Sequence, residues 1–196
     1  MDELSNLILV DIETTGLDRE RSGILSIGAV DYNSDKEFYI GTYPGSDVLI
    51  EPAALKLNGL YLNDKATPIK DAVQQFIDWS LSIYDKPILG GENVGQFDAI
   101  MLCKAFTGDM SLNWIFKHRV VDLHSIVYFL TGKSLSLKLA AEECGMRPEP
   151  EIHHALNGAK KAKEVLRYLH SLYNNPRFTI YDPIGVVRHN GYEKTW

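Results

Sequence analysis

The chain has 196 residues, 45% of them hydrophobic and 23% charged, with a formal net charge of −6, which together indicate one globular domain with a sizeable core. The acidic balance argues against a protein that coats nucleic acid non-specifically, because that binding needs many cations to neutralise phosphates. No apolar run approaches the roughly 20 residues that span a bilayer, and Met1-Asp2-Glu3 is acidic where a secretory signal is basic, so we expect a cytoplasmic protein without membrane contact.

Three strands are expected at the start of the chain. Residues 7–12 form a short apolar, β-branched run that ends before Gly16, which is typical of a buried strand. Residues 24–32 and 36–43 alternate apolar and polar side chains on either side of the turn-rich triplet 33–35. The pattern therefore predicts two antiparallel strands joined as a hairpin.

Helices and shorter strands are expected in the rest of the chain. A short helix is predicted from Pro52 to residue 57, closed by Gly59, and a longer amphipathic helix follows Pro68 over 69–81. The remaining predictions are strands at 87–90 and 119–123, and helices at 97–106, 124–131, about 135–145 and about 155–173. This order predicts an α/β fold with a central mixed five-stranded sheet flanked by helices.

Two carboxylates end the first expected strand. Asp11 and Glu13 are two residues apart, and side chains at i and i+2 of a strand point to the same face. Adjacent anions repel, and each is pushed toward protonation unless cations neutralise them. Hard divalent ions such as Mg²⁺ or Mn²⁺ suit these oxygen ligands. A solvated strand end is the competing interpretation, and Gly16, which permits close backbone approach to a ligand, favours a site.

The residues around this pair form a recognisable motif. The segment Asp11-Ile12-Glu13-Thr14-Thr15-Gly16-Leu17, followed by Ile24-Leu25-Ser26-Ile27-Gly28-Ala29-Val30, resembles the first exonuclease motif of the DnaQ-like (DEDDh) 3′→5′ exonuclease superfamily. Residues 51–60 are similar to the family's short helix after the third strand, and the resemblance covers residues 5–172. It implies a ribonuclease H-like fold for an exonuclease domain over 1–175.

A second segment, Gly91-Glu92-Asn93-Val94-Gly95-Gln96-Phe97-Asp98, resembles the family's second motif. In that motif a strand end supplies Asn, and Phe-Asp opens the next helix. Asn93 precedes Phe97 by four residues, one more than in the family's replicative proofreading subunits. A simple capping role is the alternative for Asp98, since a carboxylate is favoured near a helix N-terminus. The resemblance implies instead that Asp98 helps to hold a second metal ion.

The third motif departs from the family's pattern. His153-His154-Ala155-Leu156-Asn157-Gly158-Ala159 is similar to a DEDDh segment in which Asp follows His by five residues. His153 fits that His, which implies a general base for the attacking water, and His154 is expected to be a solvent-exposed neighbour. The fifth position holds Gly158, so a carboxylate that binds metal in the family is missing. Because Pro150 disfavours a continuous helix, we expect His153 in the loop before a helix that begins near Ala155.

Three explanations of Gly158 stay open. The protein is a natural homologue that has lost catalysis, or an introduced change has replaced Asp, or another carboxylate takes over the role. The nearest candidates in the sequence are Asp122, Glu149 and Glu151. Asp122 also resembles the family's strand-end Asp between the second and third motifs, for which we expect a structural role beside the site over direct metal binding.

The resemblance implies hydrolysis of terminal phosphodiesters of single-stranded DNA, RNA or a short oligonucleotide to nucleoside monophosphates, with activity impaired by Gly158. Asp11, Glu13 and Asp98 would hold two divalent ions, Mg²⁺ or Mn²⁺, and act with His153 as the catalytic set. The residues implied to bind the 3′ end are Thr14, Thr15, Gly16, Leu17, Asn93 and Phe97. The rival function is a catalytically silent homologue that binds a nucleotide or a nucleic-acid end.

The charges and the C-terminal tail add two further expectations. Residues 1–98 carry seven Lys/Arg and 17 Asp/Glu, whereas residues 99–196 carry 13 and nine, which suits a carboxylate site approached by a phosphate chain. The cluster of Lys160, Lys161 and Lys163 fits either that role or a solvated helix face. The aromatic tail over 176–196 is expected to pack on the domain or on an oligomer partner, and a homodimer is among the open oligomeric states.

Overall fold

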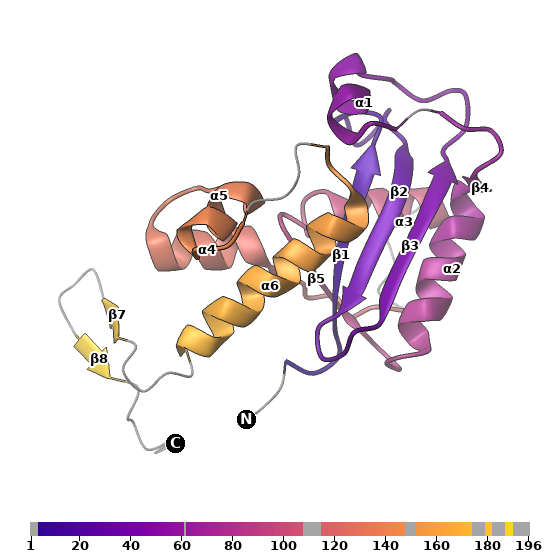
Figure 1. Cartoon of the computed structure of the whole chain (residues 1–196). Coiled ribbons are helices and arrows are strands. Elements are labelled where there is room, and N and C mark those ends of the chain that lie inside the picture. The colour runs from indigo at the N-terminus through magenta and orange to yellow at the C-terminus, as the bar shows by residue number, and fades with distance from the viewer. Residues whose placement is uncertain are drawn as a thin grey trace.

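The computed structural model describes residues 4–60, 62–107, 115–147, 152–173, 179–181 and 187–189. A mixed sheet with helices on both faces forms the body of the molecule (Figure 1). Its strands are β1 (Leu7–Thr14), β2 (Ile24–Asp31), β3 (Glu37–Tyr43), β4 (Thr67–Pro68), β5 (Ile88–Gly91) and β6 (Val121–Asp122). They lie in the order β4-β3-β2-β1-β5-β6. Strand β2 runs antiparallel to β1 and β3, and the other neighbours pair in parallel.

The helices lie close to the positions predicted from the apolar spacing. They are α1 (Pro52–Asn58), α2 (Ile69–Leu81), α3 (Asp98–Thr107), α4 (Leu123–Thr131), α5 (Leu137–Glu143) and α6 (Ala155–Tyr173). Their ends carry the expected capping residues. Gly59 closes α1 in a left-handed conformation with φ 64°, where a side chain would be disfavoured. Asp122 and Ser136 accept backbone N–H bonds at the starts of α4 and α5.

The α/β architecture with a mixed sheet is confirmed, but the sheet has six strands and not the predicted five. The additional strand β4 pairs in parallel with β3 through only Thr67 and Pro68, immediately before α2. Two residues are too few to show the alternation by which a strand is found in a sequence. The hairpin predicted around residues 33–35 is confirmed by the antiparallel pairing of β2 with β3.

The two faces of β1 belong to two separate apolar cores. The even-numbered residues Ile8, Val10 and Ile12 pack with α2 and α3, whereas the odd-numbered Leu7 and Leu9 pack with α4, α5 and α6. Helix α6 accordingly lies on one face of the sheet and α2 on the other (Figure 1). By the same alternation, the odd-numbered residues that follow Leu9 point toward the α6 face.

A close contact between β2 and α6 places the first turn of α6 on the sheet. A Cβ atom on Gly28 would lie 2.1 Å from the backbone nitrogen of Leu156 and 2.2 Å from the carbonyl carbon of Ala155. Glycine therefore allows the helix backbone to rest directly on the strand, which a larger residue would prevent. This contact sets how near the residues after Ala155 come to β1.

Three further features are the length of the helices, the two cysteines and the C-terminal tail. No helix in the described ranges is long and apolar enough to cross a bilayer. Cys103 and Cys144 are half-buried and pack against the two cores. Of the tail over 176–196, the structure describes only the antiparallel pair β7 (Thr179–Tyr181) and β8 (Val187–His189). The packing predicted for the aromatic side chains of the tail lies outside the described residues.

Candidate functional site

The loop after β1 is held by hydrogen bonds of its own threonines. The Thr15 N–H donates to the Gly23 carbonyl at 2.9 Å, and the Thr15 hydroxyl donates to the Leu49 carbonyl at 2.6 Å. The Thr14 hydroxyl donates to the Gly16 carbonyl at 2.7 Å. Both threonines are buried. Their side chains therefore fix the shape of the loop from within the protein.

Glycine and leucine at the tip of this loop meet the start of α1. A Cβ on Gly16 would lie 2.6 Å from the carboxyl carbon of Glu51, so the close neighbour of Gly16 is that side chain. The Leu17 N–H donates to Glu51 Oε1 at 3.3 Å. The Leu17 side chain is 77% exposed. The backbone of Leu17 is therefore held by Glu51, while its apolar side chain projects from the loop into solvent.

Position 158 faces the carboxylate of Asp11. A Cβ on Gly158 would lie 2.2 Å from Asp11 Oδ2 and 2.8 Å from Asp11 Cγ. Helix α6 begins at Ala155, so His153 lies in the preceding loop and Gly158 in the first turn, both as predicted. The Asp11 side chain thus leans over the glycine and occupies the space that a side chain at position 158 would need.

Asp98 is a buried carboxylate at the start of α3. It is 4% exposed, and its Oδ1 accepts the Ile12 N–H at 3.0 Å. Burial, the largest cause, together with the negative charges of Glu13 and Asp122, raises the pKa of Asp98 to about 7, while backbone hydrogen bonds partly oppose the shift. Glu13 is itself 8% exposed. The site therefore concentrates negative charge where water does not screen it.

The three motifs meet at one cavity of about 600 Å³. It is lined by Asp11 and Leu17 from the first motif, by Asn93, Phe97 and Asp98 from the second, and by His153 and Gly158 from the third. The first-motif residues Glu13, Thr14, Thr15 and Gly16 are buried and do not line it. Residues more than 140 positions apart in the sequence are thus gathered around a single space.

The two neighbouring histidines occupy different surroundings. His153 is exposed, lines the cavity, and donates its backbone N–H to the Leu57 carbonyl at 3.0 Å. His154 is not the solvent-exposed neighbour that we predicted. Its ring stacks on Tyr39 with centroids 4.4 Å apart, and its Nδ1 is buried. The prediction was wrong because Tyr39 lies on β3, whose position beside the start of α6 no local pattern reveals.

Several residues of the cavity wall were not predicted. Glu92, Leu57 and the segment Ser136-Leu137-Lys138 all line it. Glu92 was visible as a carboxylate beside Asn93 at a strand end, which is a usable signal. The α5 segment carries no such signal, because only the packing of α5 against the sheet brings it to the cavity.

Only one of the two carboxylate oxygens of Glu92 has a hydrogen-bond partner among the described residues. Its Oε1 lies 3.3 Å from His124 Nδ1, whereas its Oε2 is buried and accepts no hydrogen bond from the residues that the structure describes. Burial raises the pKa of Glu92, and the hydrogen bond with His124 partly opposes that shift. The second carboxylate oxygen of Glu92 is therefore buried and available at the wall of the cavity.

The residues at hand offer hard oxygen donors for a metal ion, but not a complete set. Asp11 and Asp98 line the cavity from β1 and α3, the charge of the buried Glu13 acts on Asp98, and such carboxylates suit Mg²⁺ or Mn²⁺. Across the described ranges, no three or more His, Cys, Asp or Glu side chains are positioned as a ready metal site. Asp122 caps α4 by accepting the Ser125 N–H, which fits the structural role expected for it. The candidates Glu149 and Glu151 lie outside the described residues.

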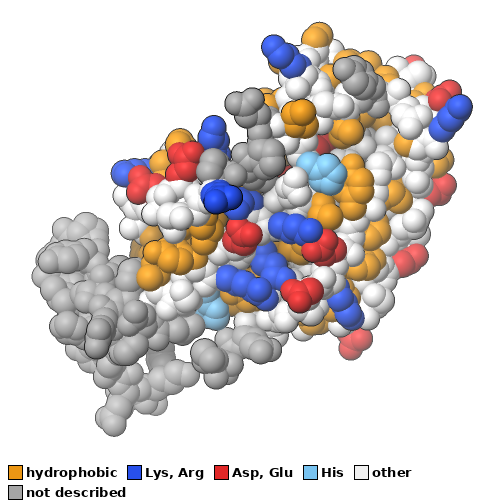
Figure 2. Space-filling view, viewed as in Figure 1, with side chains coloured by type: hydrophobic (Ala, Val, Ile, Leu, Met, Phe, Trp, Pro, Cys, Tyr) orange, Lys and Arg blue, Asp and Glu red, His pale blue; other side chains and the backbone are white. Residues whose placement is uncertain are grey.

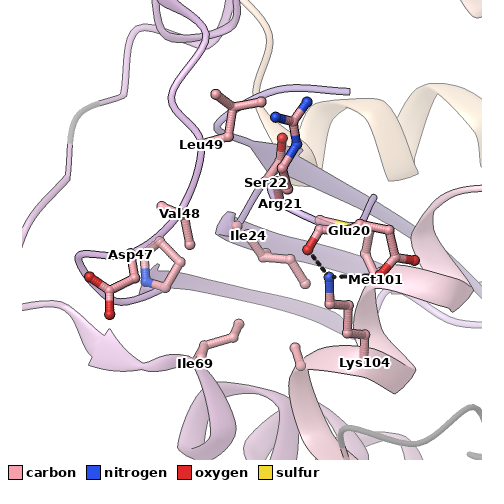
Figure 3. Close-up of a pocket in the computed structure, with 13 residues that line it drawn as sticks. Glu20, Arg21, Ser22, Ile24, Asp47, Val48, Leu49, Ile69, Met101 and Lys104 are labelled. Carbon is pink, nitrogen blue, oxygen red and sulfur yellow. Dashed lines mark hydrogen bonds and ion pairs between the residues drawn. The ribbon is translucent and has the colours of Figure 1, made fainter. Parts of the chain in front are cut away.

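A second cavity, of about 520 Å³, lies on the side of the sheet that faces α2 and α3 (Figure 3). Lys104 reaches toward the backbone there and donates to the carbonyls of Arg19 and Glu20. Its ammonium group also lies 3.6 Å from the Glu20 carboxylate. The two cations of this cavity, Lys104 and Arg21, are already bound by the chain, Arg21 through Asp18. Because of this, and because its walls hold none of the proposed site residues, this cavity is not the candidate site.

The lysine cluster of α6 is largely engaged by the protein itself. Figure 2 shows Lys and Arg side chains interspersed with Asp and Glu on this face of the molecule. Lys160 pairs with Glu37 at 2.7 Å, and Lys161 pairs with Glu164 at 2.5 Å. Lys163 donates to the Ser34 carbonyl. These contacts favour the solvated helix face over a phosphate-binding patch.

Comparisons with known proteins identify the superfamily and the fold of the chain. A family model described as the RNase H superfamily matches residues 8–175. A search among curated proteins gave no match. Similar solved structures include E. coli exonuclease I in complex with a 5cy-dT13 oligonucleotide (16% identity, TM-score 0.65, covering 87% of this chain and 43% of that chain). Another is the zinc-ion-bound E. coli exonuclease I–ssDNA complex, with 17% identity and a TM-score of 0.66, covering 86% of this chain and 42% of that chain.

Exonuclease I from Methylocaldum szegediense is similar to the same extent, with 15% identity and a TM-score of 0.63, covering 87% of this chain and 43% of that chain. This chain therefore spans less than half the length of these exonucleases. At such identities the likeness shows the fold, which is the ribonuclease H-like fold that the motif resemblance implied. Because the family model covers most of the chain, this protein belongs to the RNase H superfamily.

Proposed function

We propose that the chain is a metal-dependent 3′→5′ exonuclease that removes nucleoside monophosphates from single-stranded DNA or RNA, with activity impaired by Gly158. One observation carries the proposal: Asp11, Asp98, His153 and position 158 line the same cavity, although they come from three distant motifs. Membership of a superfamily that includes nucleases supports a hydrolase. Exonuclease I, whose fold this chain shares, holds single-stranded oligonucleotides in its structures, which supports that class of substrate.

The proposed metal ligands are Asp11, Glu13 and Asp98. Two divalent ions bound there, Mg²⁺ or Mn²⁺, would supply the Lewis acidity that polarises the scissile phosphate. The protein's own contribution would be to supply these three carboxylates, whose mutual repulsion cation binding would relieve. Burial first, and then the negative charges of Glu13 and Asp122, raise the pKa of Asp98.

The proposed base and end-binding residues surround the same space. His153 stands at the cavity with its backbone fixed to Leu57, and would accept the proton of the attacking water. Leu17 is exposed and apolar, so it would pack on the terminal base. Asn93 and Phe97 form the opposite turn, in which the Phe97 N–H donates to the Asn93 carbonyl at 3.2 Å. Thr14, Thr15 and Gly16 would act by shaping the loop that carries Leu17.

A second candidate function is a catalytically silent protein that binds a nucleotide or a nucleic-acid end. Gly158 favours it, because the Asp11 carboxylate leans into the space where a further metal ligand would stand. The absence of a ready group of three metal-binding side chains among the described residues favours it as well. This alternative retains the same cavity and the same end-binding residues.

The two functions are separated by following single-stranded DNA and RNA labelled at the 5′ end in Mn²⁺ buffer. The exonuclease predicts shortening from the 3′ end in single-nucleotide steps, less shortening when the terminus carries a 3′-phosphate, and none with EDTA or in an Asp11→Ala variant. Binding that prefers a 3′-hydroxyl without any shortening would support the silent alternative. Equal binding of both termini with no cutting would overturn both functions.

A further inference from the structure

Lys138 brings a positive charge to a cavity whose other charged walls are acidic. Asp11, Glu92 and Asp98 line this cavity, and Lys138 is the one Lys or Arg that lines it among the described residues. Lys138 lies in the first turn of α5 and is exposed. A nucleic-acid strand that enters such a cavity carries negative charge on every phosphate, so the carboxylates alone would repel it.

The charge of Lys138 is also available. No residue in the described ranges forms an ion pair with Lys138, whereas neighbouring cations are already engaged. Lys133, in the same α4–α5 segment, lies 2.6 Å from the Glu143 carboxylate, and Lys160 lies 2.7 Å from Glu37. A lysine ammonium has three donors on a flexible stem, which suits contact with a phosphate oxygen.

The segment that carries Lys138 is anchored to the cavity wall. His124, in the first turn of α4, places its Nδ1 3.3 Å from Glu92 Oε1 and 3.1 Å from the Leu135 carbonyl. Both partners of this nitrogen are acceptors, so it carries a hydrogen and donates to them. The Nε2 of the same ring lies 3.2 Å from the Ser134 hydroxyl. The end of β5 and the start of α4 are thereby joined to the loop that leads into α5.

The start of α5 is fixed as well, because the Ser136 side chain accepts the Leu139 N–H as its N-cap. Lys138 thus extends from a backbone that is held from two sides, at His124 and at Ser136. We propose that Lys138 binds a backbone phosphate of the nucleic-acid strand and so positions its 3′ end in the cavity. The inference rests on the proposed function and names a contact that the three motifs do not include.

The test is binding of a 5′-labelled oligothymidylate with a 3′-hydroxyl, measured by fluorescence anisotropy over a range of salt concentrations. Lys138→Ala should weaken binding by about fivefold at low salt, as expected for one exposed charge pair. The slope of log K against log salt should fall by about 0.7, the value for one contact on a single strand. Lys133→Ala is the matched control, since it removes the same charge from the same segment without lining the cavity.

Lys133→Ala should leave affinity and slope unchanged, and Lys138→Arg should restore both, because arginine keeps the cation. A methylphosphonate, which lacks the phosphate charge, should cancel the effect of Lys138→Ala when it replaces the contacted linkage. Equal affinities and slopes for Lys138→Ala and Lys133→Ala would overturn the inference while leaving the proposed function intact. If the unaltered chain does not bind the oligonucleotide at all, the proposed function and the inference fall together.

Discussion

Asp98 is a buried carboxylate of the candidate site with a raised pKa. Its carboxyl group is buried, and it lies in the field of Glu13 and Asp122, so its pKa is raised from the ordinary 3.8 to about 7. The folded protein therefore holds a proton on Asp98 at pH values where the unfolded chain has already lost it. In metal-free protein, the stability that Asp98 contributes is fully present below about pH 4 and is lost as the pH rises through 7.

We predict that Asp98→Asn removes this pH dependence. Asparagine keeps an oxygen that accepts the Ile12 N–H, but it cannot ionise. Urea unfolding in EDTA should show the free energy of unfolding of the variant rising relative to the unaltered chain between pH 5 and pH 8, by on the order of a few kcal/mol. Because distant groups titrate alike in both proteins, the difference between the two curves reports the titration of Asp98 together with its neighbours Glu13 and Asp122. Parallel curves would show that the pKa of Asp98 is not raised.

At the scale of residues, local patterns predicted the motif side chains but not their complete surroundings. The i, i+2 rule was enough to place Asp11 and Glu13 on one face of β1, and Pro150 was enough to separate His153 from α6. Lys138 and the stack of His154 on Tyr39 were missed, because each depends on how α5 or β3 packs in three dimensions. Such contacts join segments with no shared pattern in the sequence.

Helix α6 brings the third motif to the first through its contact with β2. The contact depends on Gly28, where a Cβ would lie 2.1 Å from the Leu156 nitrogen, which belongs to backbone and cannot swing aside. The position of Gly158 over Asp11 follows from this packing, since Gly158 is two residues after Leu156 in α6 and Asp11 pairs with Gly28 across β1 and β2. Helix α6, which carries Gly158 and follows His153, is thus positioned by Gly28, a glycine that does not line the cavity.

We predict that Gly28→Ala destabilises the fold by about 1–3 kcal/mol, the usual cost of forcing additional atoms into a packed interior. The matched control is Gly41→Ala on the adjacent strand β3, where a Cβ meets no atom within 4 Å. That variant should change stability by less than about 1 kcal/mol. Chemical denaturation of both variants measures the difference. Equal stabilities would show that α6 does not rest on β2 as described.

At the scale of elements, the boundaries of the long helices followed from apolar spacing. The predicted helix over 69–81 has those bounds, and the last helix begins and ends where expected, because each presents one apolar face to a core. The strand β4 was missed, since a pairing of two residues leaves no pattern. The pairing order of the sheet was also beyond local reasoning, because it is decided by contacts across the whole chain.

At the scale of the whole molecule, an RNase H-superfamily fold gathers residues of three distant motifs around one cavity, and the proposed exonuclease site lacks one carboxylate there. The fold provides the backbone position for that carboxylate, as Gly158 faces Asp11 from the first turn of α6. The Asp11 carboxylate, which now fills this space, is the far end of a side chain that can rotate. The backbone is therefore compatible with an aspartate at position 158, and nothing about helix stability favours glycine, which costs about 0.5–1 kcal/mol relative to alanine in a helix.

The most direct test of the account is the rate of 3′-terminal hydrolysis by Gly158→Asp beside Gly158→Asn, measured in Mn²⁺ on a 5′-labelled single strand. The two variants differ by one charged oxygen and share a similar shape, so both must displace Asp11 but only the aspartate adds a metal-binding carboxylate. We predict that Gly158→Asp cuts at least about 100-fold faster than the unaltered chain, because disturbing even the outer shell of a metal site costs 10–100-fold. The asparagine variant should show no such gain. An aspartate variant that binds the strand but cuts no faster than the asparagine variant would contradict the claim that this cavity is an exonuclease site lacking one ligand.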